Sequence, residues 1–500
     1  MASSLETPVN SASRRVWLLG GLWSWAQIGI GAVVAIFQAR LAVTLLEPTQ
    51  SGLWFILLSF MALVLLMDFG LSATLARELA FKDDAEYRSR LLVTSEKILR
   101  FAALGAFVLL APLGILYLHS ITPSALWSGT WVAWLVFVLG ASLTLHSNAA
   151  SGVLYGTGRL ALDRQIRILT QVLGLGIAYF LLRLDPSLLS LCIAWLIQSA
   201  ILWVLEWGAV RRWVPTLNSV FDKTLAWRLI SLGMRWWVTS LGAYLILNTD
   251  SLVIAGTLGA DRVPDYALLA RMSAILQPMA LVFVSSTAPL VSRLTTDGQH
   301  EQVRSILVKQ VRTALLLVLL AGAILAAIPD TLLELWVGPG HFVGFGIINL
   351  FIVLLTLEVH HVAHAVLVTA TGRLPFALWA IGSGALNIIF SLILVRYLGL
   401  LGVVLGSVLA QLFTNNWYAP LYSLKTFALS LKQYSYDVLL PMTAIGLVLY
   451  MLARRVRDLA HTWDGPVLVM TVTLLTTVTA GIGFMFINKF AKRQEVKNVH

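Results

Sequence analysis

Long apolar runs alternate with short polar segments along almost the whole chain. A helix that crosses a bilayer needs about 20 mostly apolar residues. Fourteen runs qualify as candidates, of which the fifth and the thirteenth are the shortest. They are Val16–Ala39, Ser51–Leu75, Ile98–Leu118, Leu126–Asn148, Ile168–Leu182, Leu188–Val210, Leu229–Thr257, Ala267–Leu290, Ile306–Ile328, Phe345–Thr369, Pro375–Val395, Gly399–Leu424, Val438–Leu452 and Pro466–Asn488. We therefore expect an all-α, polytopic membrane protein with about 14 transmembrane helices.

The polar connections between these runs are short. The segments near Lys82–Glu96 and Pro215–Trp227 are expected to hold amphipathic helices in the membrane interface. Pro329–Gly344, the longest loop expected on the outer side, is rich in glycine and proline. None of these connections is large enough for a soluble domain, so we expect the function to lie within or beside the membrane.

Composition and charge agree with this pattern. The chain is 58% hydrophobic and 12% charged, whereas soluble domains have about 25% charged residues. Its net charge is +11, and most basic residues fall in alternate connections, as they do in cytoplasmic loops. We expect both termini in the cytoplasm and attribute the charge to membrane orientation, not to nucleic acid binding. Arg454, Arg455 and Arg457 depart from the alternation.

The N-terminal segment and the single cysteine add two expectations. Residues 1–15 are polar and lack the small-residue cleavage site of a signal peptide, so they are expected to form a cytoplasmic tail. Cys192 is the only cysteine of the chain. An intrachain disulfide is therefore excluded.

The sequence repeats itself at an interval of 214 residues. This interval separates Thr157–Leu160 from Thr371–Leu374 (both TGRL), Trp23 from Trp237, Glu47 from Asp261, and His146 from His360. Spans one to six are thus expected to recur as spans seven to twelve. Because six is an even number, both copies have the same orientation, which is a parallel repeat.

The repeat predicts two similar six-helix lobes and a cleft in which a transporter of this kind binds its substrate. The expected division is a tail (1–15), an N-lobe (16–210), a cytoplasmic linker (211–228), a C-lobe (229–424), two further spans (425–488) and a second tail (489–500). The pairs Gly152/Gly156 and Gly402/Gly406 have the small-xxx-small spacing that permits close helix packing.

Three stretches carry a resemblance to a known superfamily. They are Met67–Leu79 (MDFGLSATLAREL), Tyr266–Leu294, which begins YALLAR, and Val368–Leu412, which contains ATGRL, ALNII and YLGLLGVVLG. Across most of residues 14–424 the chain resembles the multidrug/oligosaccharidyl-lipid/polysaccharide (MOP) exporters. Within them it is most similar to the bacterial O-antigen and exopolysaccharide flippases of the Wzx type.

The resemblance implies two six-helix lobes and a non-enzymatic function. It implies a flippase that moves an oligosaccharide, linked through pyrophosphate to a polyprenol such as undecaprenol, across the bacterial inner membrane by alternating access. Coupling to a proton or sodium gradient is expected, with no other cofactor. Partners implied beyond the lipid-linked glycan and the bilayer are a polysaccharide polymerase and assembly proteins.

Cations are the first candidates for substrate contacts. Arg271 matches an arginine that related flippases place in the cavity, and its guanidinium can bind a phosphate with two hydrogen bonds. The other interpretation is an arginine that extends to the membrane interface. Arg40 and Arg77 are further candidates, although both positions also suit interfacial anchors, and Asp68 is expected near Arg77.

An acid within the seventh span is the candidate for ion coupling. Asp250 lies in the middle of an apolar run, where a charge costs about 2.5–3.5 kcal/mol. Related lipid II flippases hold a cation with residues whose counterparts are Asp250, Asn387, Ser391, Val403 and Ser407. Ser391 stands where a second carboxylate is expected, which leaves a protonatable Asp250 as the alternative to a Na⁺ site. A purely structural Asp250 is the third interpretation.

Polar residues of the tenth and twelfth spans complete the candidates. His360 and His364 share a helix face with i,i+4 spacing, but a zinc site needs three or four ligands, so we expect no metal other than a coupling Na⁺. A proton-responsive or sugar-binding role is the interpretation for His360 and Glu358. Asn416 is a candidate for hydrogen bonds to sugar hydroxyls.

Other functions remain open at this point. A multidrug or small-cation exporter of the same superfamily is expected to have twelve spans and an acid-rich first lobe, whereas this first lobe is interpreted as poor in buried acids. A membrane glycan polymerase or transferase is expected to have large external loops with catalytic residues. A relative that does not transport is the remaining alternative.

Overall fold

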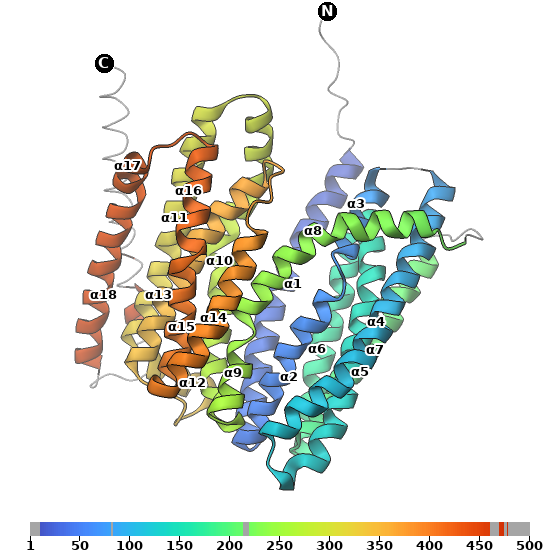
Figure 1. Cartoon of the computed structure of the whole chain (residues 1–500), viewed down its shortest axis with the longest axis horizontal. Coiled ribbons are helices and arrows are strands. Elements are labelled where there is room, and N and C mark those ends of the chain that lie inside the picture. The colour runs from blue at the N-terminus through green and yellow to red at the C-terminus, as the bar shows by residue number, and fades with distance from the viewer. Residues whose placement is uncertain (1–10, 82–83, 214–219, 461–469, 475–477, 479–500) are drawn as a thin grey trace, which may run out of the picture. The chain divides into compact units, whose positions relative to one another are not determined.

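The computed structural model describes residues 11–81, 84–213, 220–460, 470–474 and 478, which form helices joined by short turns (Figure 1). In this part of the chain, twelve helices are long and apolar enough to span a membrane. A bent pair, Trp237–Leu247 and Asp250–Thr257, raises the number to 13 if it forms one span. The predicted all-α, polytopic fold is confirmed. The fourteenth predicted run, Pro466–Asn488, lies for the most part outside the described residues.

The helices form two compact units. The first unit consists of Met1–Leu241 with Gly259–Val263, and the second consists of Gly242–Leu258 with Pro264–His500. The lobe limits predicted from the repeat, at residues 16–210 and 229–424, stay a prediction.

The first unit contains seven complete helices and most of an eighth among its described residues. They are α1 (Ser11–Leu45), α2 (Pro48–Leu66), α3 (Leu71–Phe81), α4 (Ala85–Ile121), α5 (Ser124–Gly156), α6 (Leu160–Leu184), α7 (Leu188–Trp213) and the first part of α8 (Lys223–Leu247). The 3₁₀ turn Ala260–Arg262 packs against α2.

Aromatic side chains fill the core of the first unit. Trp54 of α2 contacts the edge of Phe137 of α5, with ring centroids 5.9 Å apart. The indole of Trp134 is fully buried, and its Nε1–H donates to the carbonyl of Ala111 at 2.9 Å. Trp54 is fully buried as well, so both tryptophans belong to the core and not to the interface that tryptophan generally favours.

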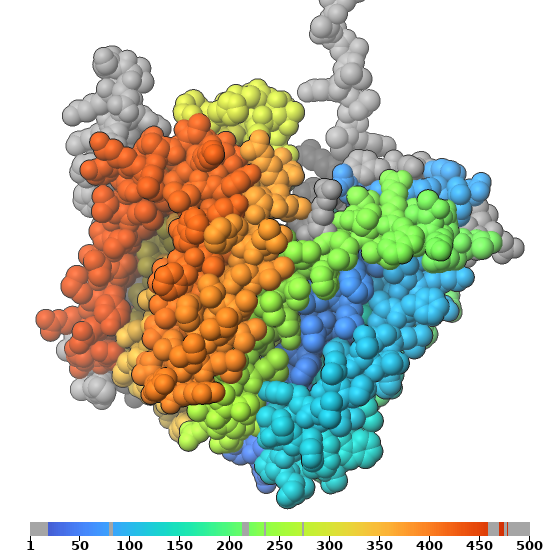
Figure 2. Space-filling model, in the orientation of Figure 1, coloured from blue at the N-terminus to red at the C-terminus, as the bar shows by residue number. Residues whose placement is uncertain are grey.

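The second unit contains the end of α8 and the remaining described helices. They are α9 (Asp250–Thr257), α10 (Val263–Thr296), α11 (His300–Ala327), α12 (Pro329–Val337), α13 (Phe345–Thr369), α14 (Ala377–Leu398), α15 (Leu400–Phe413), α16 (Asn415–Thr426), α17 (Leu431–Tyr434) and α18 (Leu440–Ala460). A π-helical turn, Ser435–Leu439, joins α17 to α18. On the face seen in Figure 2, the side chains of α14, α15 and α16 (orange) lie beside those of α18 (orange-red) in this unit.

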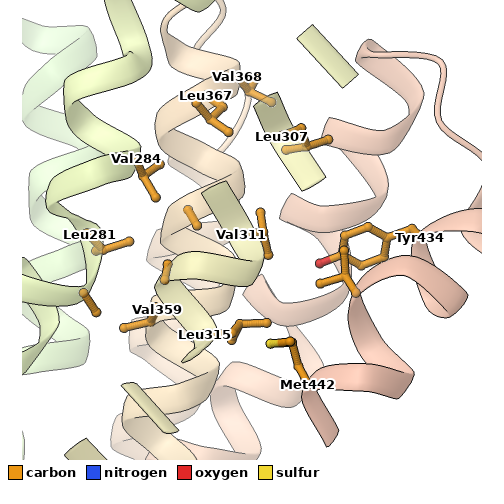
Figure 3. Packing of buried hydrophobic residues seen from close by; sticks show 14 of the residues in the cluster. Leu281, Val284, Leu307, Val311, Leu315, Val359, Leu367, Val368, Tyr434 and Met442 are labelled. Atoms are coloured by element: carbon orange, nitrogen blue, oxygen red, sulfur yellow. The ribbon is translucent and has the colours of Figure 1, made fainter. Parts of the chain in front are cut away.

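The core of the second unit includes the predicted thirteenth span. Val311 and Leu315 of α11 and Val359 of α13 share one cluster of buried side chains with Tyr434 and Met442 (Figure 3). Burial of an aliphatic side chain of this size contributes roughly 1.5–3 kcal/mol in a water-soluble protein, whereas in lipid the packing itself is the main contribution. The thirteenth span is therefore joined to the unit by packing along α11.

Two predicted spans are interrupted. The second, Ser51–Leu75, ends as a regular helix at Leu66, and a new helix begins at Leu71. Phe69 and Gly70 between them have φ angles of 50° and 68°, which an α-helix does not accommodate. The Asp68 carboxylate accepts hydrogen bonds from the backbone and hydroxyl of Ser72, at 3.3 and 2.7 Å, and so caps α3.

The seventh predicted span, Leu229–Thr257, is bent by about 40° between Leu247 and Asp250. The hydroxyl of Thr249 donates to the carbonyl of Leu245 at 2.6 Å. Asn387 Nδ2 donates to the carbonyl of Ile246 at 3.3 Å. Side chains thus satisfy carbonyls at the break, as an apolar environment requires.

Two connections differ from the prediction. The segment Lys82–Glu96 holds no separate interfacial helix in its described part, because α4 begins at Ala85 and continues through the third span. Asp84 caps α4 by accepting from the backbone of Glu86 at 3.1 Å. The loop Pro329–Gly344 begins with the short helix α12.

Close helix packing depends on the predicted small residues. A Cβ added at Gly406 would lie 2.6 Å from the backbone nitrogen of Ser391, and one at Gly402 would lie 2.3 Å from the carbonyl oxygen of Leu394. Added Cβ atoms at Gly152 and Gly156 would approach the backbone of α3 at 2.8 and 2.7 Å. Helices α14 and α15 therefore touch at backbone distance, and so do α3 and α5.

This packing predicts that Gly406→Ala destabilises the protein by about 1–3 kcal/mol, because a methyl group must displace backbone. Gly382→Ala on α14 is the matched control, since nothing lies within 4 Å of its added Cβ. Alanine in place of helical glycine is itself favourable by up to about 1 kcal/mol. Unfolding of both purified variants in detergent gives the comparison. Equal stability of the two variants contradicts the close approach of α14 and α15.

Candidate functional site

Asp250 is the first residue of α9, directly after the bend, and only 4% of its surface is exposed. Its Oδ1 accepts a hydrogen bond from Asn387 Nδ2 at 3.0 Å. Its Oδ2 accepts from the hydroxyls of Ser407, at 3.0 Å, and of Tyr266. All three donors are neutral side chains, and each comes from a different helix of the second unit.

The other predicted ion-coupling residues lie around the same point. Ser407 Oγ also lies 2.8 Å from Asn387 Oδ1 and 3.3 Å from the carbonyl oxygen of Val403. Ser391 Oγ lies 3.4 Å from Asn387 Oδ1 and 3.3 Å from the Val403 carbonyl oxygen. The structure thus brings Asp250, Asn387, Ser391, Val403 and Ser407 together. Their role in coupling stays a prediction.

This cluster, which we call the Asp250 site, has more acceptor oxygens than hydrogens. Three oxygens, one each from Asp250, Asn387 and Val403, lie within 3.3 Å of the Ser407 hydroxyl. A hydroxyl has one hydrogen to donate, so it cannot satisfy all three at once. Such a group of oxygens fits either a hard cation such as Na⁺ or an additional proton.

Tyr266 is a residue of the site that sequence reasoning did not assign to it. It lies near the start of α10, and its hydroxyl donates to Asp250 from a fully packed position, 5% exposed. The YALLAR motif includes this tyrosine, but its spacing of 16 residues from Asp250 crosses a turn and gives no helical register. Only the fold reveals the contact.

Arg271 lies one and a half turns beyond Tyr266 on the same helix. Its side chain is partly buried, and it makes no hydrogen bond or ion pair with any residue that the structure describes. A guanidinium has five N–H donors that need acceptors. Arg271 is therefore available for an anionic ligand.

Arg40 and Arg77 lie elsewhere, in the first unit. Both are exposed, Arg40 near the end of α1 and Arg77 in the middle of α3. They belong to a different unit from Arg271, and their contact with substrate stays a prediction. The neighbour of Arg77, Glu78, accepts from Tyr87 at 2.6 Å and pairs with Arg228 at 3.3 Å.

His360 and Asn416 contact each other within the second unit. His360 Nδ1 lies 3.3 Å from Asn416 Oδ1, and its Nε2 lies 2.8 Å from the Tyr434 hydroxyl. His364 Nε2 lies 2.8 Å from the same hydroxyl. Both ring nitrogens of His360 thus have protein partners, and a tyrosine lies where a metal bridging the two histidines would need to be.

The interpretation of the first lobe as poor in buried acids is wrong. Asp163 of α6 and Glu206 of α7 are both fully buried. Arg167 lies 3.4 Å from Asp163 and 3.0 Å from Glu206, and Arg164 lies 3.6 Å from Asp163. The sequence places these acids 43 residues apart, so only packing of α6 against α7 shows that they form one charge-balanced cluster.

Comparison with solved structures shows the class of fold. The fold matches the lipid II flippase MurJ, inward closed conformation, with a TM-score of 0.72, 13% identity, and coverage of 96% of this chain and 100% of the other. It also matches an inward-facing multidrug resistance MATE family transporter of the MOP superfamily, with a TM-score of 0.68, 16% identity, and coverage of 79% and 94%. The chain has the fold of the MOP transporters.

Sequence comparison then gives the family. The uncharacterized membrane protein EpsK of Bacillus subtilis (strain 168) is 23% identical over 330 residues, which span 62% of this chain and 63% of that relative. Residues 41–340 match the model of the polysaccharide biosynthesis protein family. The chain belongs to this family, and the resemblance to the polysaccharide branch of the MOP superfamily is confirmed.

The geometry of the Asp250 site predicts unequal roles for its two serines. Ser407→Ala removes a 3.0 Å donor from a buried carboxylate, which we expect to cost about 1–3 kcal/mol of unfolding free energy. Ser391→Ala is the matched control, because its contacts of 3.3 and 3.4 Å do not involve the carboxylate. We expect it to cost less than about 1 kcal/mol. Unfolding of the purified variants measures both, and a larger loss for Ser391→Ala contradicts this arrangement.

Proposed function

We propose that this protein is a flippase that moves a polyprenyl-pyrophosphate-linked oligosaccharide from the cytoplasmic to the outer leaflet of the bacterial inner membrane. The sugar would cross by alternating access of two lobes while the lipid remains in the bilayer, with both termini in the cytoplasm. Membership in the polysaccharide biosynthesis family and the MOP fold support this proposal.

One observation carries the substrate class. Arg271 is partly buried in a membrane-spanning helix and has no hydrogen-bonding or charged partner among the described residues. An unpaired charge in this environment is costly. A pyrophosphate supplies the acceptors and the negative charge that Arg271 lacks, in the planar geometry that a guanidinium recognises.

Coupling to an ion is the second part of the proposal. The Asp250 site offers oxygens in excess of hydrogens, so a proton or Na⁺ can neutralise its carboxylate. Tyr266 donates to that carboxylate and lies on the helix that carries Arg271. A change in the charge of Asp250 would therefore be transmitted along α10 to Arg271. This would link ion binding at Asp250 to the binding of the pyrophosphate by Arg271.

A drug exporter is the second candidate, favoured by the buried acids of the first unit. Asp163 and Glu206 are, however, accompanied by Arg164 and Arg167, so their cluster carries no net negative charge to attract a cationic drug. A glycan polymerase is the other alternative, and membership in the polysaccharide biosynthesis family together with a fold shared with a flippase and an exporter supports the flippase instead. Polymerase and assembly proteins would then be partners of this chain.

The substrate assignment predicts that Arg271→Gln lowers transport at least about tenfold, because loss of a charge-assisted pair costs roughly 1.5–3 kcal/mol. Arg271→Lys should retain part of the activity, since lysine keeps the positive charge but lacks the planar pair of N–H donors of a guanidinium. The matched control is Arg293→Gln on the same helix, whose side chain is exposed and pairs with Asp297. The measurement is the appearance of labelled lipid-linked oligosaccharide in the leaflet opposite the cytoplasmic one, which is the outer leaflet of right-side-out vesicles and the inner leaflet of inverted vesicles.

Normal transport by Arg271→Gln would remove this arginine from the mechanism. Normal translocation in cells that lack the protein and any paralogue would overturn the flippase assignment itself.

The coupling assignment predicts that Asp250→Asn abolishes the response of transport to an imposed proton or sodium gradient. The amide keeps the shape of the side chain but cannot bind a proton or carry a charge. Asp261→Asn is the control, because Asp261 is exposed and lies outside the Asp250 site. Gradient-driven transport that survives in Asp250→Asn excludes Asp250 as the coupling group.

A further inference from the structure

One histidine of the first unit lies among polar and aromatic side chains that the proposed transport function does not use. His146 belongs to α5, and its partners are Glu96 of α4 and Trp203 and Trp207 of α7. Helix α5 packs against both α4 and α7 (Figure 1). We call these four residues the His146 cluster.

The hydrogen on the His146 ring is placed by its two polar partners. An indole N–H can only donate, and a carboxylate can only accept. Trp203 Nε1 lies 2.8 Å from His146 Nδ1, so Nδ1 is bare and accepts. Glu96 Oε1 lies 3.3 Å from Nε2, so Nε2 carries the hydrogen. Because neither partner can reverse its role, this geometry holds the neutral Nε2–H tautomer.

The accepting role of Glu96 has independent support. Arg100, one turn further along α4, donates from Nε to the same oxygen, Oε1, at 2.8 Å. A guanidinium has no acceptor, so Oε1 carries no hydrogen. The side chains of His146 and Glu96 are 13 and 17% exposed. The imidazole is therefore neither sealed in the core nor free of its partners.

A second proton on the ring would change the contacts of His146 in opposite ways. The proton must enter at Nδ1, where it would point at the indole N–H of Trp203, so this hydrogen bond cannot persist. The contact with Glu96 would become one between opposite charges, which is stronger. The ring of Trp207 is stacked on the imidazole, with centroids 5.1 Å apart, and an indole face at this distance attracts a cation.

The three partners thus support different states of His146. Trp203 supports only the neutral imidazole, whereas Glu96 and Trp207 favour the imidazolium. Both states have hydrogen-bonding or electrostatic support within the fold, and the two states differ in whether α5 is bonded to α7 through Trp203.

Other charged groups do not contact His146 among the described residues. Of the helices packed against α5, α2 contains no ionisable residue. On the neighbouring parts of α3, α4, α6 and α7, the ionisable groups outside the cluster, Arg100 apart, have a partner elsewhere or are exposed. They are Arg77, Glu78, Lys97, Asp163, Arg164, Arg167 and Glu206. The charge that His146 meets is therefore that of Glu96, which Arg100 shares.

We propose that His146 is a proton-binding site of the first unit, at which protonation breaks the bond to Trp203 of α7 and strengthens the contact with Glu96 of α4. Its ligand is a proton, and it belongs to another unit than the Asp250 site. Glu96 lies just before the third predicted span, Ile98–Leu118, so the site takes its proton from the side that we expect to be cytoplasmic.

The effect is confined to the cluster and does not separate the two helices. Thr144 of α5 lies 3.1 Å from the hydroxyl of Ser199 of α7, and Gly140 lets α5 approach Trp195 and Leu196 closely. These contacts do not involve His146. Protonation therefore reorients the Trp203 side chain while α5 and α7 stay packed.

The test uses the full-length protein in lipid bilayers, without substrate or gradient, so its outcome does not depend on transport. Solid-state NMR of protein labelled with nitrogen-15 histidine distinguishes the Nε2–H tautomer from the imidazolium, and His146→Gln identifies the signals of His146 among the nine histidines. Ultraviolet resonance Raman spectroscopy follows the indole N–H of Trp203, which Trp203→Phe identifies. We expect the Nε2–H tautomer at neutral pH, and loss of the Trp203 hydrogen bond in the same pH step that forms the imidazolium.

Two variants should move the midpoint of this step in opposite directions. Trp203→Phe removes the donor that supports the neutral form, so the step should move to higher pH by about 0.5–1 unit. Glu96→Gln removes the negative charge that supports the imidazolium, so the step should move to lower pH. The matched control is His119→Gln, the same change at a histidine of α4 that lies against Trp127. It should leave the midpoint and the Trp203 signal unchanged.

The proposal is overturned by an Nδ1–H tautomer of His146 at neutral pH, by a Trp203 hydrogen bond that persists when the imidazolium forms, or by a His146 that stays neutral until the protein unfolds. A shift of the same sign in both variants contradicts the division of roles between Trp203 and Glu96. If Trp203→Phe does not fold, Glu96→Gln decides alone, and a midpoint that is unchanged or higher in that variant also overturns the proposal.

Discussion

A buried carboxylate in a membrane-spanning bundle must obtain its hydrogen bonds from the protein, and much of the second unit is arranged around this requirement at Asp250. The bend starts a new helix, α9, and Asp250 is its first residue. The contact of Asn387 with Asp250 and Ile246 requires α14 to lie against the bend. Ser407 of α15 reaches Asp250 and Asn387 only because Gly402 and Gly406 let α14 and α15 approach at backbone distance. Replacing any of these small or polar residues by a larger apolar one would leave the carboxylate short of donors.

The spans themselves could be predicted from the sequence because their length and apolarity are set by the bilayer. The tenth span was predicted as Phe345–Thr369, and α13 has these same ends. Helix breaks could not be predicted, because isolated polar residues such as Asp68 and Asn248 lie within longer apolar runs and do not mark the end of a helix. The prediction also missed that α4 begins in the polar segment before the third span. Backbone hydrogen bonding extends a helix beyond its apolar part, so polarity alone does not mark where the helix starts.

The site was predicted in part, and only through resemblance. Asn387 and Ser391 share a helix face at i,i+4, but nothing in the spacing of Asp250, Val403 and Ser407 shows that they meet. Tyr266 and Tyr434 were missed because each approaches from a helix whose position is a property of the fold. Asp163 and Glu206 were missed because neighbouring arginines made them resemble ordinary charged ends of spans.

The two units treat buried charge in different ways, and this difference locates where charged ligands can act. In the first unit, Asp163 and Glu206 are compensated by Arg164 and Arg167, so the cluster needs nothing from outside. In the second unit, Asp250 accepts hydrogen bonds only from neutral donors. Glu358 accepts a hydrogen bond from a side-chain amide and lies near the imidazole of His361. Arg271 has no partner among the described residues. Protons or cations are the natural complement of the two acids, and an anionic headgroup is the natural complement of the arginine. Among the described residues, the second unit thus holds buried groups of both signs without a charged partner of full opposite charge, which is the arrangement that the proposed coupling of an ion to an anionic substrate requires.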